Sequence, residues 1–305
     1  MMCGLESMNE APKHLATEDK LERRVSYYYV AFRMFLRHKP GMIGLFVVAL
    51  TLFSAVFANI IAPYDPYGLD PPLRFRPPSL AHLMGTDNLG ADVFSRIIYG
   101  SRYSLAVALL VVTISMSIGV TLGLISGYYG GIIDEIVMRS TDAFMAIPAF
   151  FLYLVALSLW DVRGVWVISI MMGIVMWPTF AKVIRSEVLS LKERPFVDAA
   201  RAMGANDLRI ITRYILPNLW GSIIIIASLR MATAILTETG LNFLGLGDPT
   251  ICSWGGMLNR AHWAGAQLEY WWAPTFPGLS ITAVTWAFNL MGDGLRDAFD
   301  VKSWR

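Results

Sequence analysis

Residues 41–62 read GMIGLFVVALTLFSAVFANIIA, a run without a single charged side chain. At a rise of 1.5 Å per residue, a helix of about 20 apolar residues crosses the hydrocarbon core of a bilayer. The sequence therefore predicts an all-α, polytopic membrane protein with six transmembrane helices. The five further predicted spans lie at residues 104–127, 143–160, 164–182, 218–238 and 273–292.

The overall composition agrees with a chain whose surroundings are the lipid bilayer. Hydrophobic residues make up 55% of the 305 residues and charged residues only 16%, and the mean hydropathy is +0.52. The net charge is +2, with basic residues scattered between apolar runs, whereas nucleic-acid binding needs them gathered on one face. Cys3 and Cys252 fit no metal-ligand spacing. We therefore expect no nucleic-acid partner and no metal site.

The distribution of Lys and Arg predicts the orientation, because cytoplasmic loops retain positive charge. With the N-terminus inside, 18 of the 25 Lys and Arg residues fall in cytoplasmic segments and six in extracytoplasmic ones. Residues 1–40 and the stretch 182–213 each contribute seven. We therefore predict a multi-pass protein of the cell membrane with a cytoplasmic N-terminal segment, 1–40, and a cytoplasmic tail, 298–305.

Two long connections fall on the extracytoplasmic side. The first, 63–103, is rich in proline, and its residues 90–100 have the spacing of a short amphipathic helix, either at the membrane interface or as a lid on the bundle. The second, 240–272, carries aromatic residues suited to the membrane edge, where they could anchor the chain or dock an external partner. These aromatic residues are Trp254, Trp263, Tyr270, Trp271 and Trp272.

The second predicted span carries glycines four residues apart, Gly119, Gly123 and Gly127. Residues at this spacing lie on one stripe of a helix, and small residues there allow two helix backbones to approach closely. We expect this stripe to be a packing surface.

The cytoplasmic stretch 193–213, ERPFVDAARAMGANDLRIITR, has the punctuation of a short helix. Pro195 suits the first helical position, Asp198 the positive first turn, and Gly204 the position just past the end. A second helix begins directly afterwards, because Asn206 or Asp207 can cap it. Its predicted apolar stripe, which continues until Pro217, is Leu208, Ile211 and Ile215.

The first of these helices has an apolar face outside the bilayer. Phe196, Ala199, Ala200 and Met203 follow one another at i, i+3, i+4 and i+7. A helix of about two turns is not stable alone in water, so packing must order this face. Its contact is either a partner protein or the chain's own bundle.

These residues carry a resemblance to a known family. The run DAARAMG at 198–204, followed by ILPN at 215–218, resembles the EAA loop of permeases from binding-protein-dependent ABC importers. GTDNLGAD at 85–92, NFLGLG at 242–247 and GDGLRD at 292–297 are similar to the second, C-type permease of dipeptide, oligopeptide and nickel importers. The likeness runs from about residue 40 to the end.

The sequence departs from this pattern at three positions. Asp198 stands where the loop usually has glutamate, Ala91 where the family usually has arginine, and Tyr214 where histidine is common. Asp198 keeps the negative charge of the loop.

The resemblance implies the type I ABC importer permease fold, with a five-helix core at 104–297 and the EAA loop at 193–213 acting as a coupling helix. It further implies four partner proteins: a second homologous permease, two cytoplasmic ATPase subunits and an extracytoplasmic substrate-binding protein. ATP and Mg would be bound by the ATPase subunits. The residues expected to contact the ATPase are Pro195, Phe196, Asp198, Ala199, Ala200, Met203 and Gly204.

The chain itself is predicted to be neither an enzyme nor a pump. None of its six lysines follows a glycine, as a phosphate-binding loop requires, and it has no GxSxG elbow. The alternative of a self-contained secondary transporter requires ionisable groups in the spans, where only Arg230 lies well inside. The resemblance favours di- or oligopeptides as substrates, with nickel complexes or oligosaccharides as alternatives.

Arg230 lies about 12 residues into the fifth span, between apolar runs. A guanidinium facing lipid costs about 2.5 to 3.5 kcal/mol, so we expect it to point inward. Glu238 is too far along the helix to pair with it, which leaves another span or the second permease as its partner. Arg230 is therefore either a structural pair between subunits or a residue that lines the translocation path.

Overall fold

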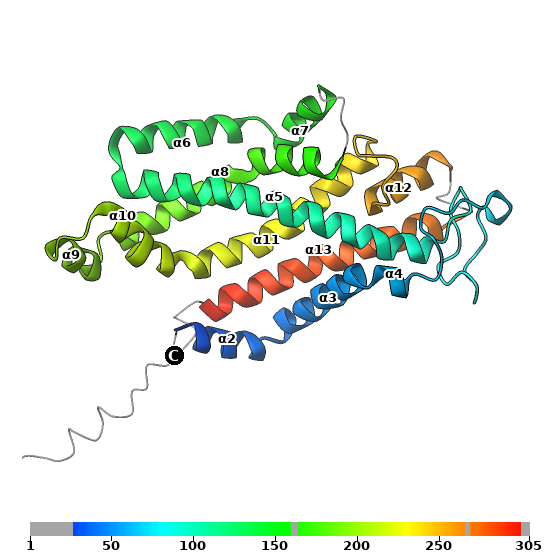
Figure 1. Ribbon diagram of the computed structural model, residues 1–305, viewed down its shortest axis with the longest axis horizontal. Helices are drawn as coiled ribbons and strands as arrows, with labels where there is room; N and C mark the ends of the chain where they lie inside the picture. Colours follow the sequence, from blue (N-terminus) through cyan, green and yellow to red (C-terminus); the bar gives the residue numbers. More distant parts are fainter. Residues whose placement is uncertain (1–26, 160–163, 266–268, 300–305) are drawn as a thin grey trace, which may run out of the picture.

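The computed structural model describes residues 27–159, 164–265 and 269–299, and within these ranges its regular elements are helical. Long helices lie side by side in one elongated bundle (Figure 1). In chain order the elements are α2 (Tyr27–Arg37), α3 (Lys39–Val56), α4 (Ala58–Ile61), η1 (Pro71–Leu73), α5 (Val93–Tyr129), α6 (Gly131–Ala146), α7 (Ala149–Ser158), α8 (Val165–Leu191), α9 (Pro195–Ala202), α10 (Asp207–Arg209), η2 (Ile210–Ile215), α11 (Leu216–Phe243), α12 (Trp254–Trp263) and α13 (Trp272–Phe299).

Four described helices are long and apolar enough to cross a membrane: α3, α5, α8 and the continuous helix Asp207–Phe243, which joins α10, η2 and α11. A fifth span results if α6 and α7 are counted together. The predicted sixth span lies in α13, which runs beside the other long helices. α13 carries more polar residues than they do, so its length and composition alone do not identify it as a span. The all-α membrane fold predicted from the sequence is therefore confirmed.

The third predicted span, 143–160, is not a straight helix. α6 and α7 meet at an angle of 81°, between Ala146 and Ala149. Pro148 disfavours the helical conformation in the residue before it, and Ile147 is accordingly extended, with φ −95° and ψ 129°. The predicted span therefore includes the end of α6 and all of α7 with a bend between them, because an apolar run reports length and polarity but not a change of direction.

The separate amphipathic helix predicted at residues 90–100 is also absent from the described chain. These residues form the first turns of α5, which continues without a break for 37 residues. Asp92 caps α5, accepting a hydrogen bond from the backbone N–H of Ser95 at 2.8 Å. The predicted boundary between residues 103 and 104 therefore falls inside one helix, and Val93, completely buried, belongs to the core.

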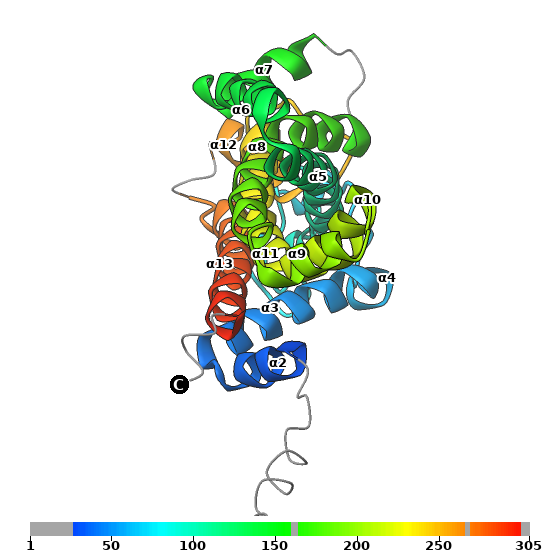
Figure 2. The same cartoon turned by 90° about the vertical axis from the view of Figure 1, so that its left-hand side faces the viewer.

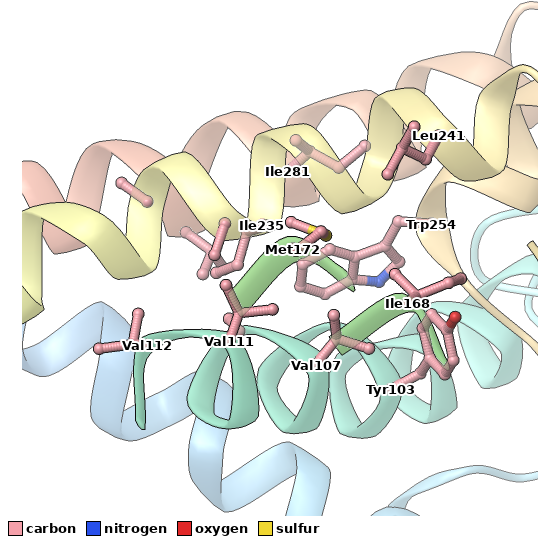
Figure 3. Close-up of a cluster of buried hydrophobic side chains, with 14 of the residues drawn as sticks. Tyr103, Val107, Val111, Val112, Ile168, Met172, Ile235, Leu241, Trp254 and Ile281 are labelled. Atoms are coloured by element: carbon pink, nitrogen blue, oxygen red, sulfur yellow. The ribbon is translucent and has the colours of Figure 1, made fainter. Parts of the chain in front are cut away.

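The main core lies where α5, α7, α8, α11, α12 and α13 meet, and Figure 3 shows part of it. Trp254, at the start of α12, is 1% exposed, and its indole N–H donates to the backbone oxygen of Ile97 at 3.0 Å. It lies against Gly100 of α5, where a Cβ atom would come within 2.8 Å of the indole ring. Other labelled members of the cluster are Tyr103, Val107, Val111, Val112, Ile168, Met172, Ile235, Leu241 and Ile281.

The glycine stripe of α5 packs against α8, as predicted. A Cβ atom on Gly123 would lie 2.8 Å from the backbone oxygen of Ala181, and one on Gly127 would lie 2.8 Å from Cβ of Val188. Lipid supplies no hydrophobic driving force between helices, so close backbone contact of this kind holds the pair together.

The two ends of the bundle differ. One end carries α2, α9 and the described end of α13, and Figure 2 views the molecule from this end. The other carries α12 and the connection 63–92. Asp87 holds this connection in place. Its carboxylate accepts a hydrogen bond from the backbone N–H of Ala91 at 3.0 Å and forms an ion pair with Arg96. Ala91 is 2% exposed.

Candidate coupling helix and polar seam

α9 is terminated by local backbone geometry at both ends. Pro195 occupies its first turn, where a missing N–H costs nothing. Beyond its last turn, Gly204 adopts φ +79°. The N–H groups of Gly204 and Ala205 donate to the carbonyl oxygens of Arg201 at 2.9 Å and Ala200 at 3.1 Å. This is a Schellman motif, which favours glycine at its left-handed position.

The two faces of α9 have different environments. Val197 and Ala200 are completely buried, in a cluster that includes Ile210, Ile211 and Ile215. The opposite side leaves large apolar side chains in the open, with Phe196 39% exposed and Met203 76% exposed. Pro195, Asp198, Ala199 and Gly204 are exposed as well.

The sequence left two contacts open for this helix, a partner protein and the chain's own bundle, and the structure shows the second. α9 packs on its own bundle through Val197 and Ala200, and an apolar face remains uncovered. The assignment of Ala200 to the partner-contacting set was wrong, because its side chain is enclosed within the chain itself. Val197 was missed because the spacing alone could not show that η2 lies beneath α9.

The second predicted helix continues directly into the fifth span. Asn206 caps it, its side-chain oxygen accepting from the backbone N–H of Arg209 at 2.9 Å. Asp207 instead accepts a hydrogen bond from the hydroxyl of Tyr128 at 2.7 Å. Leu208 is 69% exposed, so it does not belong to the predicted apolar stripe.

α9 is thus tied to the spans by two routes. Its buried face rests on η2, which is continuous with α11, and Tyr128 joins the end of α5 to Asp207. Arg201 of α9 also lies over the Tyr128 ring, at 6.0 Å from its centroid. In the described part of the chain, the ion pair of the exposed Asp198 lies within α9, with Arg201 at 3.3 Å. α9 therefore contacts segments that are continuous with or bonded to both α5 and α11.

Arg230 points toward a neighbouring span. Its Nη2 donates to the hydroxyl oxygen of Thr179 on α8 at 2.7 Å, and its side chain is partly buried. Among the described residues no carboxylate lies within ion-pair distance of it.

Polar side chains follow the facing stripes of α8 and α11, at intervals of four or eight residues. We call this set the polar seam: Thr179 and Glu187 on α8, with Asn218, Ser222 and Arg230 on α11. Toward the α9 end the seam lines a cavity of 480 Å³, which Arg296 of α13 also borders. Glu187 of α8 and Ser222 of α11 border the same cavity.

Sequence reasoning identified only Arg230 in this seam. The four-residue spacing of Asn218, Ser222 and Arg230 is visible in the sequence and could have indicated a polar stripe. That Thr179 and Glu187 face it depends on how α8 packs against α11, which spacing does not reveal.

Comparison with known proteins identifies the family. Residues 119–305 match the family model described as binding-protein-dependent transport system inner membrane component, and residues 26–78 match the N-terminal TM domain of oligopeptide transport permease C.

Curated relatives match over almost the whole chain. The glutathione transport system permease protein GsiD of Pectobacterium atrosepticum is 41% identical over 279 residues, covering 89% of this chain and 90% of that protein. The dipeptide transport system permease protein DppC of Alkalihalophilus pseudofirmus is 38% identical over 298 residues, covering 97% and 96%.

Among solved structures, the fold resembles an inward-facing conformation of the MetNI methionine ABC transporter, with a TM-score of 0.55. The identity is 17%, and the match covers 67% of this chain and 96% of that one. Together these matches show that this chain belongs to the binding-protein-dependent transport system inner membrane components, the permease subunits of ABC transporters.

Proposed function

We propose that this chain is one of two permease subunits of an ATP-driven importer of di- or oligopeptides. The relatives whose names specify glutathione, dipeptides or peptides support this substrate class over nickel complexes or oligosaccharides. The observation that carries the proposal is α9, which is fixed to its own chain on one face and leaves Phe196 and Met203 uncovered on the other.

In this proposal the exposed face of α9 occupies a groove of a cytoplasmic ATPase subunit. The contacting residues are then Pro195, Phe196, Asp198, Ala199, Met203 and Gly204. The ATPase pair binds ATP and Mg, and this chain takes no catalytic part. When the ATPase subunits close, α9 moves with them, and its links to η2 and Tyr128 carry the motion into α11 and α5.

The polar seam is proposed to form this subunit's side of the translocation path. A peptide carries charged and polar groups that lipid-facing helices cannot solvate, whereas Glu187, Ser222 and Arg230 offer both charges and a hydroxyl. Arg230 then lines the path, and its positive charge offsets a carboxylate of the passing peptide. A second permease, facing the seam, would complete the path.

The proposed orientation puts the α9 end in the cytoplasm. It follows from the excess of Lys and Arg in the segments at that end, and it makes both termini cytoplasmic. The connections 63–92 and 244–271 then face the extracytoplasmic binding protein that delivers the peptide. The protein is accordingly assigned to the cell membrane.

The proposal is tested by reconstituting the subunit with its second permease, ATPase pair and binding protein in proteoliposomes. Uptake of a labelled dipeptide should require both ATP and the binding protein. Uptake that an ion gradient drives without ATP would contradict the proposal and indicate a secondary transporter.

A further inference from the structure

A second cavity, of 360 Å³, lies at the α12 end of the bundle. Three segments enclose it: the connection around Tyr67, the turn 245–250 after α11, and α12. The side chains that bear on its chemistry are Tyr67, Arg96, Asn242, Asp248, Asn259 and Arg260. The polar seam contributes no residue to it, so the two cavities are separate.

Arg260 is the unusual member of this set. Its Nε and Nη2 atoms are buried, and among the described residues they have no hydrogen-bond partner. An arginine keeps its charge in a protein, and its planar group of five N–H donors matches a carboxylate. Leaving two buried N–H donors of a guanidinium without partners is costly, and a carboxylate in the cavity would satisfy both.

The other charges around the cavity are already engaged. Arg96 pairs with Asp87, and its Nε donates to the backbone oxygen of Pro66 at 2.9 Å. Asp248 accepts from both the N–H and the hydroxyl of Thr250, at 2.9 Å and 2.6 Å. Arg96 and Arg260 are matched in number by Asp87 and Asp248, but among the described residues no carboxylate lies within ion-pair distance of Arg260.

Two further effects act on Arg260 itself. Burial, and after it the neighbouring charge of Arg96, lower the pKa of Arg260. The arginine nevertheless stays protonated, because its ordinary pKa lies far above the physiological range. An anion beside Arg260 would relieve both effects.

We propose that Arg260 is the cation of a carboxylate-binding site that takes the terminal carboxylate of a peptide at the outer end of the path. The inference rests on the proposed function for its ligand and for its orientation. The Tyr67 hydroxyl and the side-chain oxygens of Asn242 and Asn259 are further polar groups on the cavity wall for the rest of a short peptide, whereas the amide nitrogens of Asn242 and Asn259 already donate to Glu238 and to the backbone oxygen of Phe243. Along α11 the site lies about 18 Å beyond Arg230, at 1.5 Å per residue to Asn242.

The test is equilibrium dialysis of labelled Ala-Ala and of its C-terminal amide against the purified importer complex in nanodiscs, without binding protein and in phosphate-free buffer. The wild-type complex should bind Ala-Ala and discriminate against the amide. Arg260→Gln should weaken Ala-Ala binding by at least about tenfold, the scale of a lost charge-assisted hydrogen bond. Arg260→Lys should retain part of the affinity.

Two matched controls isolate the site. Arg74→Gln removes an exposed arginine at the same end of the molecule and should change nothing. Arg76→Gln removes a second exposed arginine of the same connection and should likewise leave this binding intact. Equal affinity of Arg260→Gln and wild type, or no binding of Ala-Ala by wild type at millimolar concentration, would overturn the proposal.

The carboxylate could instead belong to an acidic side chain of the binding protein. In that case Arg260→Gln would leave Ala-Ala binding unchanged. It would instead raise the concentration of binding protein needed for half-maximal stimulation of the ATPase. This result would overturn the assignment of Arg260 to the peptide carboxylate. A melting temperature lowered by both Arg260→Gln and Arg260→Met would show a structural role and also refute it. ATP-dependent uptake by the wild-type complex without Ala-Ala binding would refute this inference alone and leave the proposed function standing.

Discussion

Substitution of Gly204 isolates the contribution of one backbone conformation to coupling. Its φ of +79° is the left-handed conformation that ends α9, and a Cβ atom added there would meet nothing within 4 Å. The cost of a side chain is therefore a backbone cost, free of any clash. For alanine it is about 1 to 2 kcal/mol, for asparagine less, and for a β-branched residue toward about 3 kcal/mol.

These costs act on α9, a helix of 8 residues. A loss of about 1 to 2 kcal/mol lowers the ratio of ordered to disordered α9 by roughly 5- to 30-fold. Stimulation of the ATPase by loaded binding protein, measured in proteoliposomes, should therefore fall in the order Gly204→Asn, Gly204→Ala, Gly204→Val. Membrane insertion should stay normal, because the long spans are untouched.

A matched control is Gly130, which has φ +67° and also no atom within 4 Å of an added Cβ. Gly130 also has ψ −155°, a combination essentially restricted to glycine, so Gly130→Ala introduces at least as much backbone strain between α5 and α6, outside α9, and should keep ATPase stimulation and uptake. Normal uptake with Gly204→Val, or equal damage from the Gly130 variant, would refute the reasoning.

Three further predictions follow from exposure and charge. Ala199→Leu should block association with the ATPase without lowering the melting temperature of the permease. Ala200→Leu should instead overpack the interface with η2 and destabilise the permease by about 1 to 3 kcal/mol. Pull-down measures the association and thermal unfolding the stability, and equal behaviour of the two variants would contradict a helix with one buried and one exposed face. In a cysteine-free background, Leu80→Cys, 99% exposed, should react with an impermeant thiol reagent on intact cells and Met203→Cys should not; the opposite pattern would reverse the topology. Arg230→Gln should leave the complex assembled and reduce uptake of free-acid peptides more than of amidated ones; loss of assembly would assign Arg230 to subunit pairing instead.

The sequence was informative wherever the cause was local. Pro195 and Gly204 delimit α9 in the structure close to where their chemistry predicts, because a ring without an N–H and a residue free of Cβ act on their own backbone. The glycine stripe of α5 was equally predictable, since a repeat of four residues on a helix is one face whatever lies opposite.

Features that depend on a distant segment were not predictable in the same way. The choice of Val197 over Phe196 as a buried residue is made by η2, and the burial of Trp254 by Gly100 of α5. The aromatic residues of 240–272 were expected at the membrane edge, yet Trp254 is 1% exposed whereas Trp263 is 80% exposed. The periodicity of a sequence shows which residues share a helix face, but it does not show which segment of the chain covers that face.

The central claim, that the exposed face of α9 binds an ATPase subunit, is tested most directly by photo-crosslinking. A photoreactive amino acid at Met203, 76% exposed, should crosslink to the ATPase in the assembled complex, and the same residue at Leu80 should not. The Met203 crosslink should also disappear in the Gly204→Val background. A complex that is active in transport but gives no ATPase crosslink at Met203, or gives an equal one at Leu80, would contradict the account.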